Sequence, residues 1–509
     1  MTSGLQMRMP SGASSDAVCP AISDEFLQFR RPRCPPLSSG FARDGDDHTT
    51  IDSRRRERPY DGPMMKKTFL RASLAMGFML LCELAQATTF TAGAGRADIA
   101  IPDDIYPIDG FVGQHDPLAT RVILLDDGTT RLGIIVVDQT SLSDESIANM
   151  KDALQQVAQV APAQTIVSAS HGFSAPHVLP HEHTSPDVQA QSTRMQQALL
   201  NAVRSAALSA VKSMTIAQVG YGEGVSRVNV NRDVSTPFGW WLGANGEGNS
   251  DPALSVLRID TARGAPLAVV INYAVQSSVM DGSTLKAGGK LITSDLAGVA
   301  TRYVEQHGGA PVAAFLVGAA GDQAPRRQAN RHVVNHDGSV TRVDSHEEGF
   351  TLLDQLGTEL GRAATEVSGG IHAAATPTLT LERKSVTVTS QTNSPGNAPK
   401  GPVTTYTYTP GRPVALPVVL IRIGDIALVG VQPELAAQIG ERIKAESPFA
   451  HTWVLTMVDG AAKYLPDDAS YNRFTYEARS SGFAQGSADK LVDAVHGWLN
   501  DLHRAAPHP

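Results

Sequence analysis

The sequence has only three cysteines among its 509 residues, Cys19, Cys34 and Cys82. All three lie before the point at which we expect a signal peptide to be cut, so the mature chain would have none. Such a chain forms no disulfide framework, and it has no thiolate to serve as a nucleophile or a metal ligand. Any catalysis or metal binding must therefore rest on other side chains.

Positive charge is also in short supply. The chain has 43 Lys and Arg against 51 Asp and Glu. Residues 1–87 hold 12 of the basic and 10 of the acidic residues, which leaves 31 basic and 41 acidic residues and a net charge of −10 for residues 88–509. This balance argues against a nucleic-acid partner.

The apolar run near the N-terminus is too short to span a membrane. Residues 64–87 begin with two methionines and two lysines, continue with this run and end in an Ala-Gln-Ala cleavage site at 85–87. These features predict a secretory signal peptide and a secreted or periplasmic protein. Residues 1–63 show little apolar periodicity and are predicted to be a disordered or mis-annotated extension. Residues 88–509, without repeats or a convincing linker, are predicted to form one domain.

From Thr88 onward, apolar strands alternate with amphipathic helices. A buried strand at 131–138 is followed by a helix that Ser143 could cap, and then by a second strand at 165–170. Such a β-α-β unit is typical of parallel sheets. Further strands are expected at 266–275, 311–318, 425–431 and 451–458, and helices at 296–306 and 435–445.

The predicted fold is α/β, a single large domain with a mixed, mainly parallel central sheet flanked by helices. The segment 377–412 alternates apolar and polar residues around a centre rich in Ser, Pro, Gly and Asn. This pattern predicts an antiparallel excursion from the main sheet.

Five expected strands are each followed by a polar side chain. In chain order these are His171, Gln276, Asp322, Glu434 and Tyr464. In open α/β sheets ligands bind outside the carboxyl ends of the strands, so we expect these side chains to share a site. Any one of them taken alone is more often a satisfied core group or a solvated surface group. Together, histidine nitrogen and glutamate oxygen suit Zn²⁺, which in catalytic sites keeps one position open for water.

Six short segments carry a resemblance to a known family. They are GAGRADIAIPDD, VSASHGFSAP, NYAVQSSVMDGSTLKAGGKLITSDLAG, GAAGDQAP, QPE and YEARSSGFAQGS. In their order and spacing, from about Gly93 to Leu502, they resemble the motifs of the neutral/alkaline ceramidases, which are zinc-dependent N-acylsphingosine amidases. The resemblance implies a zinc-dependent hydrolase of a linear amide, with a lipid amide as the first expectation for the substrate.

Residue by residue, the resemblance places the zinc ligands on His171, Gln276, Glu434 and Tyr464. It places catalytic or substrate-contacting roles on Arg232, Tyr476 and Asp322. A small-molecule or lipid amide substrate is implied, with peripheral membrane contact as a possibility and no obligate protein partner evident.

The chain departs from the family pattern at three positions. Gln276 stands where the family has a second zinc histidine, Phe173 where it has a substrate-contacting histidine, and Ala324 where it has a serine thought to be catalytic. Two alternatives therefore stay open: a metal-dependent hydrolase of a non-lipid amide or ester, and a binding protein that has lost catalysis. His177, His181 and His183 follow the first motif, and one of them could replace the missing ligand; otherwise they form a polar loop at the rim.

Overall fold

The computed structural model describes residues 89–178, 185–392 and 399–505. The extension predicted at 1–63 and the signal peptide predicted at 64–87 lie outside these ranges, so both stay predictions. The described residues all belong to the compact unit that begins at Thr88. Within this described part of the chain, no helix is both long enough and apolar enough to cross a membrane.

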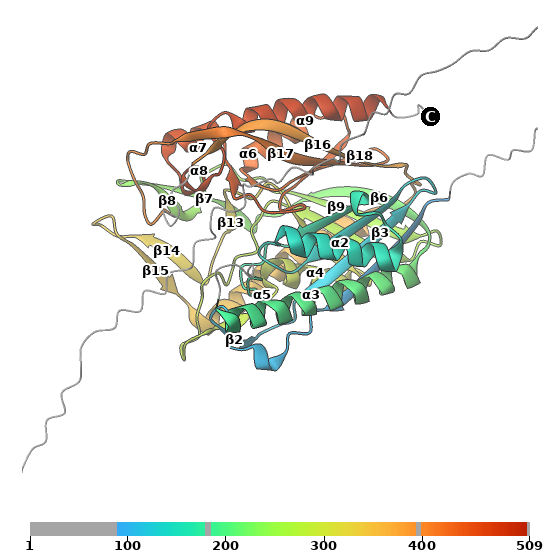
Figure 1. The fold of residues 1–509 in the computed structure, drawn as a ribbon, viewed down its shortest axis with the longest axis horizontal. Coiled ribbons are helices and arrows are strands. Elements are labelled where there is room, and N and C mark those ends of the chain that lie inside the picture. The colour runs from blue at the N-terminus through green and yellow to red at the C-terminus, as the bar shows by residue number, and fades with distance from the viewer. Residues whose placement is uncertain (1–88, 179–184, 393–398, 506–509) are drawn as a thin grey trace, which may run out of the picture. The chain divides into compact units, whose positions relative to one another are not determined.

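The central sheet has eight strands (Figure 1). From one end to the other they are β12 (Ala313–Val317), β10 (Pro266–Tyr273), β9 (Ala253–Thr261), β6 (Thr215–Val225), β1 (Thr91–Asp98), β3 (Ala119–Asp126), β4 (Arg131–Val137) and β5 (Thr165–Ala169). The sheet is mixed: β12 with β10 and β4 with β5 are parallel, and every pairing between them is antiparallel.

The α/β class and the mixed sheet are confirmed, but the expectation of a mainly parallel sheet is wrong. Four residues connect β3 to β4, and four connect β9 to β10. Connections this short can join only antiparallel neighbours, whereas a parallel pair needs a crossover of a dozen residues or more. The two end strands, β12 and β5, also contact each other, so the sheet curls.

A second sheet packs against the inner face of the first. Its strands are β16 (Leu379–Gln391), β17 (Pro410–Ile423), β18 (Ile426–Val431) and β20 (His451–Leu455). β16 and β17 form an antiparallel hairpin, so the antiparallel pairing predicted for 377–412 is present, although β17 continues to Ile423. β18 lies parallel to β20. The hairpin therefore belongs to a separate sheet, together with the strands expected at 425–431 and 451–458, and is no excursion from the main one.

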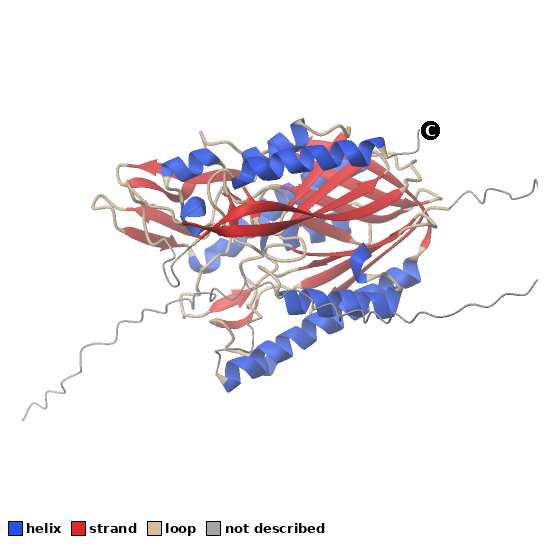
Figure 2. Cartoon of the chain, turned by 45° about the horizontal axis from the view of Figure 1, so that its top comes forward, coloured by secondary structure: helices blue, strands red, loops and turns tan. Residues whose placement is uncertain are grey.

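The described helices are α2 (Asp144–Ala158), α3 (Pro186–Ser213), α4 (Asp295–His307), α5 (Gly349–Gly369), α6 (Ala437–Ala445), α7 (Asp468–Arg473), α8 (Tyr476–Ser480) and α9 (Ser487–Arg504), with short 3-10 turns at Asp103–Ile105 (η2), Pro162–Gln164 (η3) and His346–Glu348 (η4). Helices α2 to α6 and α9 pack on the outer faces of the two sheets (Figure 2). As predicted, Ser143 caps α2, because its hydroxyl accepts the backbone N–H of Ser146.

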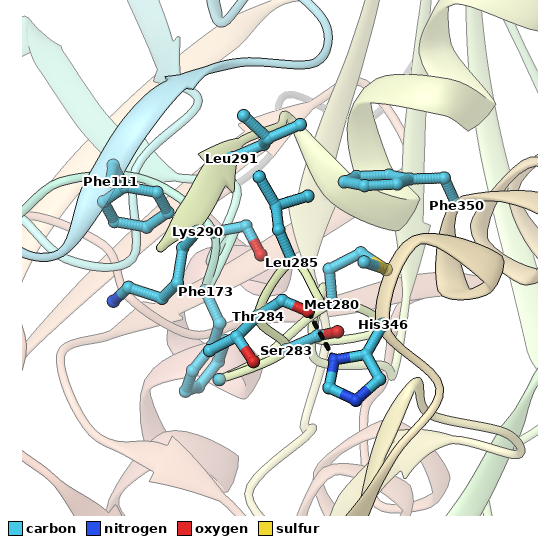
Figure 3. A pocket seen from close by; sticks show the side chains of 12 residues that line it. Phe111, Phe173, Met280, Ser283, Thr284, Leu285, Lys290, Leu291, His346 and Phe350 are labelled. Carbon is cyan, nitrogen blue, oxygen red and sulfur yellow. Dashed lines mark hydrogen bonds between the residues drawn. The ribbon is translucent and has the colours of Figure 1, made fainter. Parts of the chain in front are cut away.

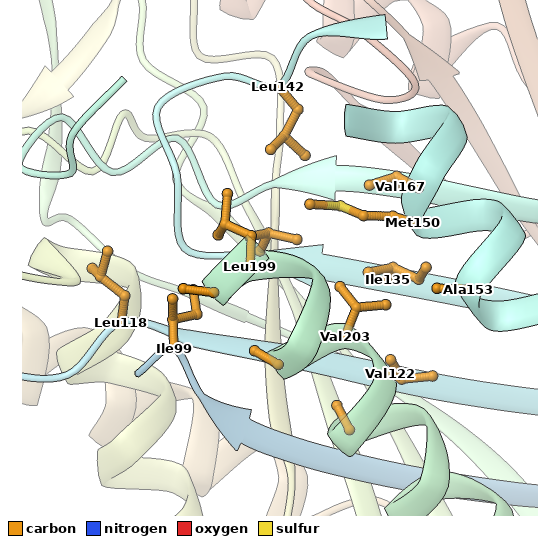
Figure 4. Packing of buried hydrophobic residues seen from close by; sticks show 14 of the residues in the cluster. Ile99, Leu118, Val122, Ile135, Leu142, Met150, Ala153, Val167, Leu199 and Val203 are labelled. Carbon is orange, nitrogen blue, oxygen red and sulfur yellow. The ribbon is translucent and has the colours of Figure 1, made fainter. Parts of the chain in front are cut away.

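Separate hydrophobic clusters join these layers. Figure 4 shows Met150 of α2 and Leu199 of α3 packed over Ile135 and Val167 of the central sheet. α4 and α5 pack on the β9, β10 and β12 part of the same sheet, and α6 and α9 pack on the second sheet. Between the two sheets, apolar side chains of both inner faces form a further cluster. Strands covered on both faces, such as β4, β5, β10, β12 and β18, therefore read as continuous apolar runs.

Further strands outside the two sheets pair with one another and link the segments that connect the sheet strands. The pairs are β2 (Phe111–Gln114) with β11 (Lys290–Ile292), β13 (Gln323–Pro325) and β8 (Gly239–Asn245) each with β7 (Asn229–Thr236), β14 (Asn330–Val334) with β15 (Val340–Asp344), and β19 (Glu434–Leu435) with β21 (Tyr464–Leu465). Most of the polar side chains singled out in the sequence lie on or beside these short strands.

Candidate functional site

His171 lies at the centre of the candidate site. It follows β5, is buried, and has a left-handed backbone with φ of 59°. A residue other than glycine held in this conformation costs of order 1 kcal/mol, and such strain gathers at functional sites. The Nδ1 atom lies 2.7 Å from the carbonyl oxygen of Thr140, so it carries a proton and donates it. Nε2 is therefore the atom that His171 presents to the site.

The connection after β5 is fastened to the connection after β10. Gly172 and Ser277 form a β-bridge, and the Phe173 N–H donates to the Ser277 carbonyl oxygen at 2.9 Å. This brings Gln276 close to His171, although β5 and β10 lie in opposite halves of the sheet order. The curl of the sheet, which the sequence pattern does not reveal, makes this meeting possible.

Glu434 lies opposite His171, with its Oε2 3.0 Å from His171 Nε2. Glu434 stands on β19, which pairs with β21 so that Glu434 is in register with Tyr464. The N–H of Gly321 donates to the Leu435 carbonyl oxygen at 2.7 Å. A Cβ at Gly321 would lie only 2.8 Å from the Glu434 carbonyl oxygen, so this close approach requires glycine.

The Gln276 amide bridges Glu434 and Arg232. Its Nε2 donates to Glu434 Oε2 at 2.5 Å, and its Oε1 accepts from Arg232 Nη1 at 2.6 Å. The opposite amide orientation would set NH₂ against a guanidinium and oxygen against a carboxylate, so the neighbours fix this one. Gln276 thus lies where it was expected, but its oxygen faces Arg232 and not the space between His171 and Glu434.

Arg232 is the buried cation of the site. Its Nε and Nη2 both lie 2.7 Å from Glu477 Oε1. Its Cζ lies 5.2 Å from the ring centroid of Tyr464 and 5.9 Å from that of Tyr476. Two aromatic rings and a carboxylate therefore hold the guanidinium, whose Nη1 points to Gln276.

The pKa directions at this site follow from burial and from these pairs. Burial acts to lower the pKa of His171, but the Glu434 carboxylate outweighs it and the pKa is raised. Burial acts to raise the pKa of Glu434, but His171 and Arg232 outweigh it and the pKa is lowered. Burial and the charge of Glu434 hold the pKa of Tyr464 well above its usual range, so Tyr464 is a neutral phenol here.

Asp322 lies beside the site and organises its backbone. Its carboxylate accepts the Ala437 N–H at 2.8 Å, at the start of α6, and the side-chain amide of Asn231 at 3.1 Å. Its backbone carbonyl accepts the Arg232 N–H at 2.9 Å. Burial raises the pKa of Asp322 to about 6. In this arrangement Asp322 joins β7, α6 and the connection after β12.

The donors present fit a zinc ion in part. His171 Nε2 is buried and has no hydrogen-bond partner, although Glu434 Oε2 lies 3.0 Å from it. That spacing is close to the roughly 3.3 Å between neighbouring donors of a tetrahedral zinc ion with bonds of about 2 Å. Among the described residues, no group of three or more His, Cys, Asp or Glu could hold a metal. A third protein ligand would therefore be Tyr464, with Gln276 bracing Glu434.

Phe173 lies beside His171. Its ring meets the His171 imidazole edge-on, with centroids 4.7 Å apart. Phe173 also lines a small pocket that opens to solvent (Figure 3). Its lining includes Phe111, Met280, Leu285, Leu291 and Phe350. Phe173 thus places an apolar ring beside His171, where the family resemblance led us to expect a histidine.

Ala324 and His177 add no group to the described site. Ala324 is buried on β13, paired with Val230. His177 is half-exposed, and its Nδ1 lies 2.7 Å from Asp109 Oδ2. His181 and His183 lie outside the described residues, so their role stays a prediction.

Sequence reasoning missed two acidic residues of the site, Glu477 and Asp233. Each is a direct chain neighbour of a residue that was named: Asp233 follows Arg232, and Glu477 follows Tyr476. Both are buried, with exposed fractions of 1 % for Glu477 and 6 % for Asp233. A carboxylate next to a named site residue was the available signal, because a buried arginine requires a paired anion.

Comparison with solved structures shows the same fold in neutral ceramidases. The crystal structure of neutral ceramidase from Pseudomonas aeruginosa superposes with a TM-score of 0.63 and 18 % identity, covering 83 % of this chain and 76 % of that one. A ceramidase complexed with C2 gives a TM-score of 0.61 and 18 % identity, covering 82 % and 76 %. No family model and no curated protein sequence matches the chain.

Proposed function

We propose that this chain is a zinc-dependent hydrolase of an amide or ester, similar in action to the ceramidases whose fold it shares. One observation carries the proposal. His171, Glu434, Gln276 and Arg232 come from four distant segments and meet through contacts of 2.5–3.0 Å in a buried site. Burying several ionisable groups together costs folding free energy, and such clusters occur preferentially at functional sites.

Each residue has a chemical task in this proposal. His171 and Glu434, with Tyr464, would hold the metal, and zinc bound there would polarise a substrate carbonyl and acidify a water. Arg232 presents N–H donors that can stabilise negative charge developing on the substrate oxygen. Tyr476 packs against both Tyr464 and Trp241, with ring centroids 6.0 and 5.8 Å apart, so its position is fixed beside Arg232.

A lipid amide is the substrate class that we propose first, because the solved neighbours are ceramidases. Export to the periplasm or exterior, inferred from residues 64–87, and peripheral contact with a membrane would give the enzyme access to such a substrate. A non-lipid amide or ester is the competing substrate class, which the apolar Phe173 beside His171 leaves open.

The test combines metal analysis with a substrate panel. The purified mature chain would be assayed for bound zinc and for hydrolysis of N-acyl amides and esters of increasing acyl length. The variant Glu434→Ala should lose both zinc and activity, whereas Glu359→Gln, which alters a half-buried Arg326 pair elsewhere, should keep both. Absence of hydrolysis across the panel by zinc-loaded protein would overturn the proposal.

A binding protein on the same fold is the second candidate, and the Gln276 bridge favours it. With Oε1 on Arg232 and Nε2 on Glu434, the amide satisfies both charged neighbours without a metal. Ala324 supplies no hydroxyl. A chain that contains no zinc, hydrolyses nothing, and still binds a lipid amide would identify this second function.

A further inference from the structure

The first turn of α4 contains a buried carboxylate, Asp295, that forms no ion pair with a described residue. Its backbone has φ of 50°, a left-handed conformation that side chains other than glycine rarely adopt. Burial raises the pKa of Asp295 to about 6, although the backbone N–H groups of Met280, Val279 and Leu296 act to lower it. A buried carboxylate without a cation beside it costs folding free energy, and strained residues gather at functional sites.

The Asp295 carboxylate binds the backbone of the connection after β10. Its Oδ1 accepts the Val279 N–H at 2.8 Å, and its Oδ2 accepts the Met280 N–H at 2.9 Å. In the same connection, Ser277 Oγ accepts a further N–H from the first turn of α4 at 2.9 Å. Because Ser277 directly follows Gln276, the start of α4 holds the segment that carries the Gln276 amide.

The start of α4 also contacts the connection after β5. Ser174, three residues after His171, donates its hydroxyl to Asp295 Oδ2 at 3.4 Å, and its carbonyl oxygen accepts the Thr293 N–H at 3.0 Å. Thr293 Oγ1 in turn accepts the Asp295 N–H at 3.1 Å. Asp295 therefore contacts both of the segments that deliver His171 and Gln276 to the site.

These contacts fix the two connections against each other. A β-bridge already joins them directly, and Asp295 braces them from the side of α4. A shift of the connection after β10 would leave buried N–H groups and a buried carboxylate unpaired, so the hydrogen bonds to Asp295 oppose it. The Gln276 amide is thereby kept within reach of both Glu434 and Arg232.

We propose that Asp295 is a positioning residue for the candidate site, which holds the connections after β5 and β10 so that the His171 imidazole and the Gln276 amide keep their places. Asp295 acts through the backbone of these connections. Its effect on zinc binding or catalysis rests on the proposed function, whereas its effect on the placement of the two side chains does not.

The test replaces the carboxylate with an amide of the same size. Asp295→Asn keeps one oxygen for an N–H group but turns an NH₂ group toward the other, and asparagine tolerates the left-handed backbone. Asp127→Asn is the matched control. Asp127 is also buried, and its carboxylate accepts two N–H groups of the β3–β4 turn and the Leu379 N–H. This turn precedes β4, whereas His171 follows the parallel strand β5, so the control lies at the far end of these strands.

NMR spectra of the mature chain report the placement of both side chains. Labelled histidine and glutamine give signals for the His171 Nδ1–H, which donates to Thr140, and for the Gln276 side-chain amide. Both signals should shift or broaden in Asp295→Asn and keep their wild-type positions in Asp127→Asn, although both variants should melt at a lower temperature. Wild-type signals in Asp295→Asn, or equal changes in Asp127→Asn, would overturn the proposal.

A second variant, Ser277→Ala, decides the question if Asp295→Asn does not fold. It removes the oxygen that accepts an N–H from the first turn of α4. Its control is Ser213→Ala, which removes a half-buried oxygen that accepts the Ala94 N–H. The same two signals should change in Ser277→Ala and not in Ser213→Ala; unchanged signals in Ser277→Ala would then overturn the proposal.

Zinc alone is the second probe. Titration against a competing chelator should show that Asp295→Asn binds zinc roughly 10- to 100-fold more weakly than the wild type, the usual effect of changing groups that orient metal ligands. A wild-type chain that binds no zinc and hydrolyses no amide or ester would refute the proposed function. The NMR comparison needs neither zinc nor substrate, so it would still decide the role of Asp295.

Discussion

Gln276 donates to an anion on one side and accepts from a cation on the other, and this sets the chemistry of the site. An amide in this position stabilises Glu434 and Arg232 at once, but its oxygen is not offered to a metal. A histidine that binds zinc through one ring nitrogen keeps only an N–H on the other, so it could not also accept a hydrogen bond from Arg232. One residue therefore shifts the balance between a metal site and a metal-free polar network.

Gln276→His should tighten zinc binding by roughly tenfold, the scale of single changes around metal ligands. Imidazole nitrogen is a better zinc ligand than an amide oxygen, and the change frees Glu434 Oε2. Titration against a competing chelator measures the effect, with Gln328→His outside the site as the control. A zinc affinity equal to or weaker than that of the wild type would mean that residue 276 cannot reach the metal. The other explanation is that His177, His181 or His183 already occupies the ligand position.

Arg232→Lys should lower kcat by about 100-fold, the usual cost of losing a donor to a developing oxyanion. Lysine has a single side-chain nitrogen, so it cannot contact Glu477 and Gln276 at the same time as the guanidinium does. Steady-state kinetics on the best amide of the panel would measure the loss. The matched change Arg326→Lys alters a half-exposed pair with Glu359 and should leave kcat alone; equal rates in both variants would refute the role given to Arg232.

At the scale of elements, short strands and connections do the positioning. β19 and β21 contain only Glu434–Leu435 and Tyr464–Leu465, yet their pairing places two candidate ligands side by side. The connection after β12 packs against β19 through Gly321, where a Cβ would meet backbone atoms that cannot move aside. The site thus depends on backbone fit between short segments that are distant in the sequence.

Gly321→Ala should destabilise the fold by about 1–3 kcal/mol, the usual range for overpacking. It should also weaken zinc binding, because Glu434 must move. Urea unfolding and zinc titration test the two parts. Gly497→Ala is the control: Gly497 lies in α9 with nothing within 4 Å of its added Cβ, so alanine there should stabilise by about 0.5–1 kcal/mol. An unchanged free energy of unfolding in Gly321→Ala would show that the connection after β12 can shift at little energetic cost.

At the scale of the whole molecule, the curled central sheet brings together connections that the strand order keeps apart. The second sheet then closes its inner face and contributes Glu434 and Tyr464, which follow β18 and β20. Four of the site residues discussed, His171 and Gln276 from one sheet and Glu434 and Tyr464 from the other, therefore meet where the two sheets join.

The mature chain is expected to begin at Thr88. Cleavage after the Ala-Gln-Ala site would leave β1, which starts at Thr91, intact. Intact-mass spectrometry of the exported protein, expressed from its own start, would identify the N-terminus. A mature chain that retains Met1 would contradict both the signal peptide and the predicted export.

The sequence by itself determined the local structure and the candidate residues. Apolar periodicity and the Ser143 cap predicted α2, apolar runs predicted β4, β5, β10, β12, β18 and β20, and polar residues after those strands named His171, Gln276 and Glu434. These features are local, because hydrogen bonding and burial along one element leave their mark on neighbouring residues.

Only the tertiary structure decided the direction of the sheet and the inner chemistry of the site. Short hairpins made the sheet mostly antiparallel, and its curl, not a shared parallel edge, brought the strand ends together. The orientation of the Gln276 amide and the pairing of Glu477 with Arg232 depend on residues separated by 44 to 245 positions. No local pattern specifies such contacts, because their energy arises from charges that meet only after the chain has folded.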